Sequence, residues 1–418
     1  MGVGAMKLLS VPLTFLASIL LARGLGPEGF GQYAFVIALI TTLSIPLAPA
    51  MMQLTTRETA ALHQSGQEDL IRALLRWANR HVLIGSVLAI MVVGSVAVWM
   101  ADWRADDRWT MLLAGLTALP LLGFNAVRSG ILAGLRRVVQ GQFAELFVRP
   151  LTLLLVAASL LLAGALNPLT ALLAFLAGVT LAFVVGSVLL RRTFAESEEV
   201  TLPDGPVKNR QWLRAWVPFT LLVMASTLNA QVGILLLGWM STDEQVAAMQ
   251  VAERGGMLVV LSLTVVNLVI GPHITRIHRS GDRARLQAIS RHSARMALVV
   301  ALPIALPLIF FGKSILNVIF GAEYAEIATW PLVILAISQL VNVVFGSVGR
   351  LLVMSGYEAH SLLGQLVALL VVVVCSFFLI PAYGATGASV AIGFGILIWN
   401  VVLSFKVYYV LGIRPGVV

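Results

Sequence analysis

The sequence predicts an all-α integral membrane protein with 12 transmembrane helices in two six-helix bundles that are parallel repeats of each other. The first observation is composition: 59% of the 418 residues are hydrophobic and 11% are charged, whereas a soluble domain carries about 25% charged residues. The second is the run from Val82 to Ala101, which contains no charge. About 20 such residues at 1.5 Å per residue span a hydrocarbon core of about 30 Å. The third is that similar runs recur along the whole chain.

The individual spans are bounded by charged residues, glycine and proline. The first six are expected near residues 7 to 22, 30 to 50, 81 to 101, 111 to 133, 145 to 165 and 169 to 190. The second six are expected near residues 215 to 239, 246 to 271, 296 to 312, 330 to 352, 361 to 380 and 386 to 410.

The segment between the second and third spans has a helical pattern of its own. Apolar residues form one stripe and arginines form another, which predicts a helix lying in the membrane interface. The two stripes consist of Leu70, Leu74 and Ala78, and of Arg72, Arg76 and Arg80.

The distribution of lysine and arginine predicts the orientation, because basic residues stay on the cytoplasmic side. With the N-terminus inside, 20 of the 28 basic residues fall on the cytoplasmic side, and four fall on the opposite side: Arg23, Arg104, Arg108 and Lys313. Both termini are therefore expected in the cytoplasm.

The longest polar stretch divides the chain. It carries glutamates, prolines and glycine between Arg191 and Arg214, a composition that favours an extended linker. The expected organisation is an N-terminal six-helix bundle (1–192), a cytoplasmic linker (193–213) and a C-terminal six-helix bundle (214–418). The halves also match at a constant offset, at which Arg76 corresponds to Arg291 and Arg80 to Arg295. Because each half has an even number of spans, the repeats are expected to be parallel.

Several soluble chemistries are not supported by the residues. The net charge of +9 comes from short clusters between apolar runs rather than from one basic face, so no nucleic-acid partner is expected. Gly312-Lys313-Ser314 lacks the first glycine of a phosphate-binding loop, because position 307 is proline. The six histidines lack metal-site spacing, and Cys375 is the one cysteine. We therefore expect no metal, no cofactor and no catalytic residues.

One acidic cluster leaves an enzymatic alternative open. Asp102, Asp106 and Asp107 resemble the acidic site of a glycosyltransferase. The loop that carries them is expected on the outer side, where sugar nucleotides are absent, which favours a solvated turn.

The informative residues are the ionisable groups inside the spans, because charge in a bilayer normally faces a bundle interior or an aqueous cavity. Three arginines lie near the cytoplasmic ends of their spans, where snorkelling is the competing explanation, and a fourth lies about eight residues inside the external end of its span. Glu145 precedes Arg149 by four residues, so the two can form an ion pair on one helical face. The candidate substrate-binding residues of a cationic cavity are Arg128, Arg149, Arg254 and Arg350, and the candidates for ion coupling or charge balance are Glu145 and Glu253.

Three segments resemble a known transporter family. The segment from Leu21 to Ala34 (LARGLGPEGFGQYA) resembles the first external turn and second helix of the polysaccharide-transporter branch of the MOP exporter superfamily, which includes the Wzx-type flippases. Residues 381–388 (PAYGATGA) and 320–324 (FGAEY) extend the likeness over essentially the whole chain. These motifs are structural turns and carry no substrate residue.

The resemblance implies a flippase that moves polyprenyl-diphosphate-linked oligosaccharide from the cytoplasmic to the outer leaflet of a bacterial inner membrane by alternating access. Implied partners are the lipid-linked oligosaccharide, membrane lipids, an H⁺ or Na⁺ coupling ion and polysaccharide polymerase or assembly proteins. Arginine suits a diphosphate because its guanidinium is permanently charged and binds in a bidentate manner. An ion-coupled small-molecule antiporter of the multidrug type and a membrane glycan polymerase or ligase are the alternatives.

Overall fold

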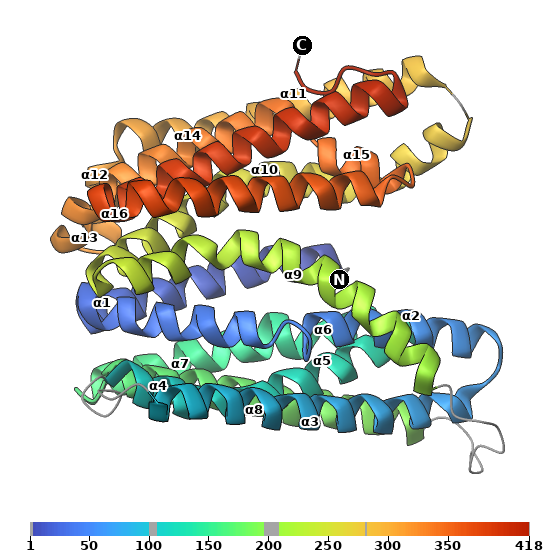
Figure 1. Cartoon of the computed structure of the whole chain (residues 1–418), viewed down its shortest axis with the longest axis horizontal. Helices are drawn as coiled ribbons and strands as arrows, with labels where there is room; N and C mark the ends of the chain where they lie inside the picture. Colours follow the sequence, from blue (N-terminus) through green and yellow to red (C-terminus); the bar gives the residue numbers. More distant parts are fainter. Residues whose placement is uncertain (1–2, 100–106, 196–208, 281, 418) are drawn as a thin grey trace. The chain divides into compact units, whose positions relative to one another are not determined.

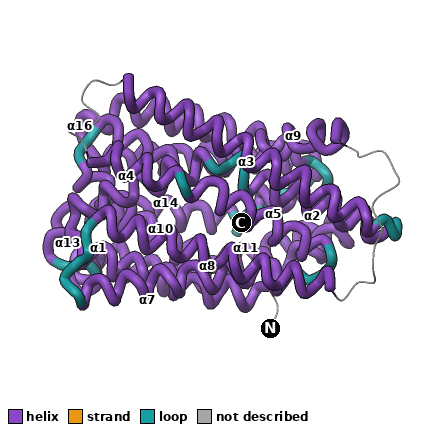
Figure 2. The backbone as a smooth tube through the Cα atoms, turned by 90° about the horizontal axis from the view of Figure 1, so that it is seen from below, coloured by secondary structure: helices purple, strands orange, loops and turns teal. Residues whose placement is uncertain are grey.

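The structure, a computed structural model, describes residues 3–99, 107–195, 209–280 and 282–417. Within these ranges every regular element is a helix, which confirms the predicted all-α class (Figures 1 and 2). Most of the expected linker, residues 196–208, lies outside the described residues.

The chain divides into two compact units, Met1–Thr227 and Leu228–Val418. The border between them lies inside one helix, α9 (Asn209–Met240). The sequence placed its border in the polar stretch before this helix, and the bounds of the two six-helix bundles stay a prediction.

The first unit is built from helices that follow one another with short connections. It contains the first part of α9 and the elements α1 (Val3–Leu43), α2 (Pro49–Gln64), α3 (Glu68–Trp99), α4 (Asp107–Leu116), α5 (Ala118–Gly134), α6 (Val138–Phe143), the π-helix η1 (Ala144–Val148), α7 (Arg149–Leu162) and α8 (Pro168–Ala195).

The second unit has the same all-helical character. It contains the last part of α9 and the elements α10 (Asp243–Ser280), α11 (Arg283–Phe310), α12 (Gly312–Ile319), α13 (Ala322–Ile327), α14 (Thr329–Phe345), α15 (Val348–Met354) and α16 (Glu358–Leu411).

The membrane character of these helices is confirmed by their length and composition. Among the described residues, nine helices are long and apolar enough to cross a membrane, or ten if the bent pair of α14 and α15 is one span. Two of the nine, α1 and α16, contain an internal glycine with a non-helical backbone, Gly26 and Gly384. The sequence places external turns at both glycines, and the exact count of twelve spans stays a prediction.

Contacts within α16 show that it consists of two antiparallel arms. Gly364 on the first arm lies against Leu403 on the second, and Val372 lies against Gly395. These contacts pair residues at nearly equal distances before and after Gly384, where φ is +53° and a side chain would be strained. Figure 1 shows the red ribbon of α16 running in both directions.

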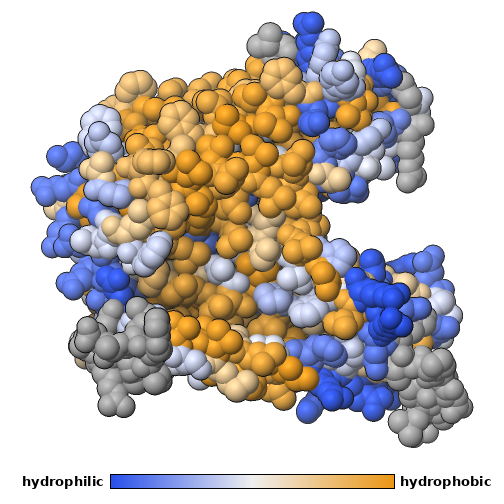
Figure 3. All heavy atoms as spheres, in the orientation of Figure 1, coloured by the Kyte–Doolittle hydropathy of each residue, from blue (hydrophilic) through white to orange (hydrophobic). Residues whose placement is uncertain are grey.

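The helices bury small and aliphatic side chains inside each unit and expose large apolar ones. In the first unit, Met51, Leu74 and Ile131 are completely or almost completely buried in one core. Large apolar side chains elsewhere remain exposed, among them Leu155 and Val92 at about 60%. Figure 3 shows hydrophobic residues covering much of the visible face, with hydrophilic residues gathered near helix ends. Such a surface suits a lipid environment.

The helix expected in the interface is continuous with the third span. α3 begins at Glu68 and runs without a break to Trp99, so the stripes at residues 70–80 belong to its first turns and do not form a separate interfacial helix. The corresponding helix of the second unit, α11, begins at Arg283. Glu68 and Arg283 are related by the same offset that relates Arg76 to Arg291 in the sequence repeat.

Candidate functional site

The six ionisable residues expected to carry function are distributed over both units. Arg128 lies on α5, Glu145 on η1 and Arg149 at the start of α7, all in the first unit; Glu253 and Arg254 lie on α10 and Arg350 on α15, in the second. The structure brings the three residues of the first unit into one polar region.

The centre of this region is the ion pair between Glu145 and Arg149. Oε2 of Glu145 lies 2.6 Å from Nη1 of Arg149. The Asn125 amide donates a hydrogen bond to the other oxygen, Oε1. The Glu145 side chain is 24% exposed and that of Arg149 is 35% exposed. The carboxylate therefore has partners on both oxygens, while the guanidinium keeps donors that a ligand can reach.

Glu145 and Arg149 lie on a widened helical turn that precedes Pro150. Pro150 has no N–H group, so the carbonyl four residues earlier receives no helical hydrogen bond from it. The preceding turn is wider: the N–H of Arg149 donates to the carbonyl of Ala144, five residues back. Such π-turns often occur at functional positions of helices. Here the turn carries both members of the ion pair.

Arg128 is held by neutral partners instead of a carboxylate. Its Nε donates to Oγ of Ser187 at 2.7 Å, and its Nη1 donates to the carbonyl of Phe124 at 2.7 Å. Its Cζ lies 4.4 Å from the ring centre of Phe183, within the range of a cation–π interaction. Within the described ranges, these contacts fix Arg128 between α5 and α8 and leave its positive charge uncompensated by an ion pair.

Two glycines of α8 allow this close packing. A Cβ atom at Gly178 would lie 2.9 Å from the carbonyl oxygen of Arg149, and one at Gly186 would lie 2.9 Å from the side-chain oxygen of Asn125. Larger residues at these positions would push α8 away from the polar region. Small residues thus let the helices approach closely, as is usual in membrane bundles.

The candidate residues of the second unit are more dispersed. The guanidinium of Arg350 lies over α10 at Gly271, where a Cβ atom would be 3.3 Å from Nη2. Glu253 and Arg254 are half-buried neighbours on α10. The Glu253 carboxylate interacts electrostatically with the neighbouring Arg254, and within the described residues it makes no direct hydrogen bond or ion pair.

The second unit also contains a polar chain of amides. Nδ2 of Asn400, a completely buried residue, donates to Oδ1 of Asn342 at 2.9 Å. Nδ2 of Asn342 in turn donates to Oε1 of Gln339 at 3.2 Å. These residues link α14 to the second arm of α16.

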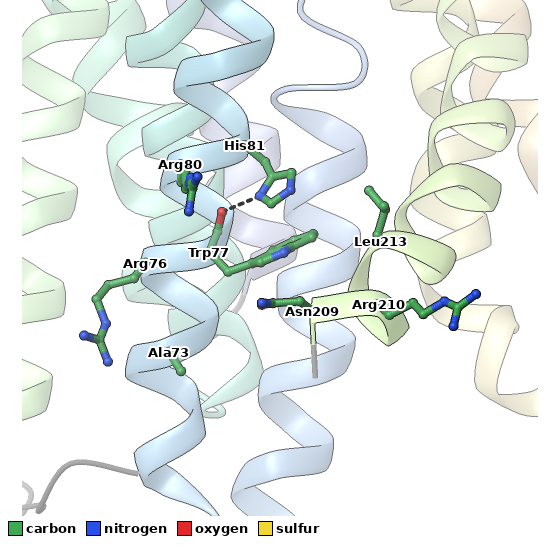
Figure 4. A pocket seen from close by; sticks show the side chains of 8 residues that line it. All are labelled: Ala73, Arg76, Trp77, Arg80, His81, Asn209, Arg210 and Leu213. Carbon is green, nitrogen blue, oxygen red and sulfur yellow. Dashed lines mark hydrogen bonds between the residues drawn. The ribbon is translucent and has the colours of Figure 1, made fainter. Parts of the chain in front are cut away.

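The first unit contains a pocket at one end of α3 and α9. Its volume is about 650 Å³. It is lined by Ala73, Arg76, Trp77, Arg80 and His81 of α3 and by Asn209, Arg210 and Leu213 of α9 (Figure 4). Among the described residues, this lining contains three arginines and no carboxylate, so this part of the pocket wall is cationic.

No metal site is visible in the ranges that the structure describes, where no three His, Cys, Asp or Glu side chains come close enough to hold an ion. Of the acidic cluster considered from the sequence, Asp102 and Asp106 lie outside the described residues, and Asp107 is the first residue of α4.

Comparison with known families identifies the chain. The sequence profile described as polysaccharide biosynthesis protein matches residues 3–278, well over half of the chain. This chain belongs to the polysaccharide biosynthesis protein family. The match confirms the family resemblance and includes the turn at residues 21–34, whereas residues 320–324 and 381–388 lie beyond the matched range. A comparison with curated proteins gave no match.

Solved structures show that this family member has the MOP fold. An inward-facing multidrug resistance MATE transporter of the MOP superfamily is 14% identical with a TM-score of 0.80, over 96% of this chain and 94% of that one. The lipid II flippase MurJ in an inward closed conformation is 12% identical with a TM-score of 0.76, over 97% and 87%. A MOP superfamily transporter from Pyrococcus furiosus is 15% identical with a TM-score of 0.67, over 97% and 93%.

Sequence reasoning missed several polar residues of this family member. Asn125, Asn342 and Asn400 lie inside expected spans, and an intramembrane amide is itself a signal because its hydrogen bonds must be satisfied by protein. Arg76 and Arg80 of the pocket belong to the arginine stripe that the sequence indicated, but no pattern along the chain indicated that α9, with Arg210, lies beside them.

Proposed function

We propose that this protein is a flippase that moves polyprenyl-diphosphate-linked oligosaccharide from the cytoplasmic to the outer leaflet of the bacterial inner membrane by alternating access. The cargo would serve cell-surface polysaccharide biosynthesis. The proposal is supported by membership of the polysaccharide biosynthesis protein family and by a fold found in transporters, one of which is a lipid II flippase. In this proposal both termini are cytoplasmic.

The observation that carries the proposal is the partly exposed ion pair of Glu145 and Arg149 within otherwise apolar helices. A charge inside a membrane is costly unless it is paired or hydrated. A diphosphate presents several oxygens to which a guanidinium binds with two parallel hydrogen bonds. Arg149 can therefore exchange its carboxylate partner for the cargo and return to it on release.

The other candidate residues take related roles in this proposal. Arg128 and Arg350 act with Arg149 in capturing the diphosphate near the cytoplasmic ends of their spans, and Arg254 contacts it deeper in the membrane. Arg128 suits this role because Ser187 and a carbonyl satisfy two of its donors without neutralising it. Its charge remains available to attract an anion.

One observation favours a second candidate, an ion-coupled small-molecule antiporter of the multidrug type. Glu253 is a half-buried carboxylate on α10 that interacts electrostatically with Arg254 and makes no direct hydrogen bond or ion pair within the described residues. A carboxylate inside a membrane is a usual site of cation or proton binding. A MATE transporter also shares the fold. In the flippase proposal the same carboxylate binds H⁺ or Na⁺ for coupling, so its presence alone does not separate the two functions.

The deciding experiment is flipping by the purified protein in liposomes that contain a fluorescent polyprenyl-diphosphate oligosaccharide. Cargo in the inner leaflet is protected from a membrane-impermeant quencher, and cargo in the outer leaflet is not. Liposomes with the wild-type protein should therefore lose fluorescence faster than protein-free liposomes. Arg149→Gln and Arg254→Ala should lose flipping, and Arg254→Lys should restore part of it because the ammonium keeps the charge and loses the planar fork. Arg285→Gln, a change at an exposed arginine of α11, is the control.

The outcomes separate the candidate functions. No flipping together with proton-driven efflux of an organic cation would establish the antiporter. A glycan polymerase or ligase would instead be shown if deletion abolished glycan synthesis in inverted membrane vesicles. A flippase deletion should leave synthesis intact and should accumulate lipid-linked intermediates in the cytoplasmic leaflet.

A further inference from the structure

The cationic pocket of the first unit is separate from the polar region around Glu145. Its residues on α3 are Ala73, Arg76, Trp77, Arg80 and His81, a helical stripe in which successive members are one or three residues apart. They therefore line one face of the helix. The first two turns of α9 form the opposite wall.

Two of the lining residues, Trp77 and His81, belong to an aromatic cluster. The ring centres of Trp77 and Trp212 are 5.5 Å apart in an edge-on arrangement, and Trp212 is completely buried. The His81 ring lies 4.1 Å from that of Trp77, and its Nδ1 is 2.8 Å from the Trp77 carbonyl. A carbonyl oxygen only accepts hydrogen bonds, so Nδ1 carries the proton and Nε2 remains for another partner.

The rim of the pocket carries three arginines. In the part of the chain that the structure describes, the guanidinium groups of Arg76, Arg80 and Arg210 make no hydrogen bond or ion pair, and all three side chains are exposed. Figure 4 shows Trp77 turned toward α9, with Arg76 and Arg210 on the outer sides of the two helices. Each guanidinium is thus free to turn toward an anion at the mouth.

The corresponding face of α11, in the second sequence repeat, contacts the C-terminal segment of the chain. Arg295 corresponds to Arg80 in the repeat, and its Nε donates to the carbonyl of Val417 at 3.1 Å. About two helical turns earlier on α11, Gln287 exchanges hydrogen bonds with the backbone of Arg414. In the second unit, the C-terminal segment of the chain thus contacts α11 at Arg295 and Gln287. In the first unit, Arg80, which corresponds to Arg295, lines the pocket instead.

Apolar stripes lead from the rim into the membrane. On α3, exposed side chains continue from Arg80 through Leu83 and Val87 to Met91; on α9 they continue from Arg210 through Leu213, Val217 and Leu221. Both stripes follow the helical repeat. A ligand that fits has an anionic head and long apolar chains, a combination that distinguishes a lipid from a free anion.

We propose that the pocket between α3 and α9 binds the phosphate headgroup of an anionic phospholipid, whose acyl chains lie along the exposed stripes of the two helices. The guanidinium groups bind phosphate oxygens, Trp77 lies at the membrane interface, and the apolar stripes contact the chains. The site anchors the cytoplasmic end of the first unit and is distinct from the proposed cargo residues.

The test uses the purified full-length chain in detergent and counts bound lipids by native mass spectrometry during titration. The wild-type protein should bind phosphatidylglycerol about tenfold more tightly than phosphatidylcholine, a difference of about 1.4 kcal/mol. The Arg76→Gln/Arg210→Gln variant should lose this preference, and Arg76→Lys/Arg210→Lys should keep most of it. The control variant, Arg276→Gln/Arg285→Gln, removes two exposed arginines of the second unit and should behave as wild type.

Four results would overturn the proposal. Equal binding of the two phospholipids by wild type would exclude a headgroup site. An equal loss in the control variant would show that only net charge matters. Displacement of phosphatidylglycerol by millimolar inorganic phosphate would indicate a simple anion site. Retention of a polyprenyl diphosphate but not of phosphatidylglycerol would make the pocket a cargo site.

Discussion

Replacing Glu145 by glutamine tests whether cargo and carboxylate compete for Arg149. If they do, Glu145→Gln frees the guanidinium, so a diphosphate-headed lipid should bind more tightly than to the wild-type protein. A purely structural ion pair predicts the opposite, because its loss would disorder the site and weaken binding. The sign of the change therefore discriminates between the two roles.

The magnitude follows from the geometry of the pair. Exposed ion pairs contribute about 0.2–1 kcal/mol, and hydrogen bonds to charged groups contribute about 1.5–3 kcal/mol. With side chains 24% and 35% exposed and a separation of 2.6 Å, the pair falls between these limits. An interaction of about 1–1.4 kcal/mol corresponds to binding that is about five- to tenfold tighter.

The assay is isothermal titration of the protein in nanodiscs with a short-chain polyprenyl diphosphate. Glu58→Gln is the matched control, because Glu58 pairs with Arg57 at the same 2.6 Å in a segment outside the spans. Arg149→Gln should weaken binding. Equal tightening in Glu58→Gln, or no tightening in Glu145→Gln, would refute the competition between Glu145 and the diphosphate.

Two further predictions concern packing and topology. Gly186→Val should lower the melting temperature in a thermal-shift assay, because a Cβ atom there would lie 2.9 Å from the side-chain oxygen of Asn125 and overpacking costs about 1–3 kcal/mol. The control is Gly94→Val, at a glycine with open space around it, which should change the melting temperature little. Equal shifts in the two variants would refute the packing argument. For topology, single cysteines are introduced at Asn167 and Gln140 in a Cys375→Ala background. A membrane-impermeant thiol reagent added outside whole cells should label the cysteine at position 167 and not the one at position 140. The reverse pattern would invert the proposed orientation.

Much of the fold could be predicted because membrane physics leaves few options. Long apolar runs must form helices in order to satisfy their backbone hydrogen bonds in lipid. The turns at Gly26 and Gly384 could also be anticipated, because glycine tolerates the backbone angles found there, with φ of +70° and +53°. The start of α11 at Arg283 was implicit in the repeat, because it corresponds to Glu68, the first residue of α3.

The arrangement of the site could be predicted only in part. The spacing of Glu145 and Arg149 predicted their ion pair, which the structure contains. The π-turn could not be predicted from Pro150 alone, because a proline also permits a simple kink. The partner of Arg128 on α8 is likewise a tertiary contact without a local signal.

Arg128 and Arg149 illustrate how arginines inside predicted spans can be stabilised in different ways. Ser187, a backbone carbonyl and aromatic rings hold Arg128 and leave its charge intact, whereas Glu145 neutralises Arg149. A site with only the first arrangement would hold an anion tightly, and a site with only the second would attract it weakly. Transport requires both capture and release. In the proposed flippase, the fixed positive charge of Arg128 would provide an attraction that persists, and Arg149, whose carboxylate partner can be exchanged, would provide a contact that can be reversed.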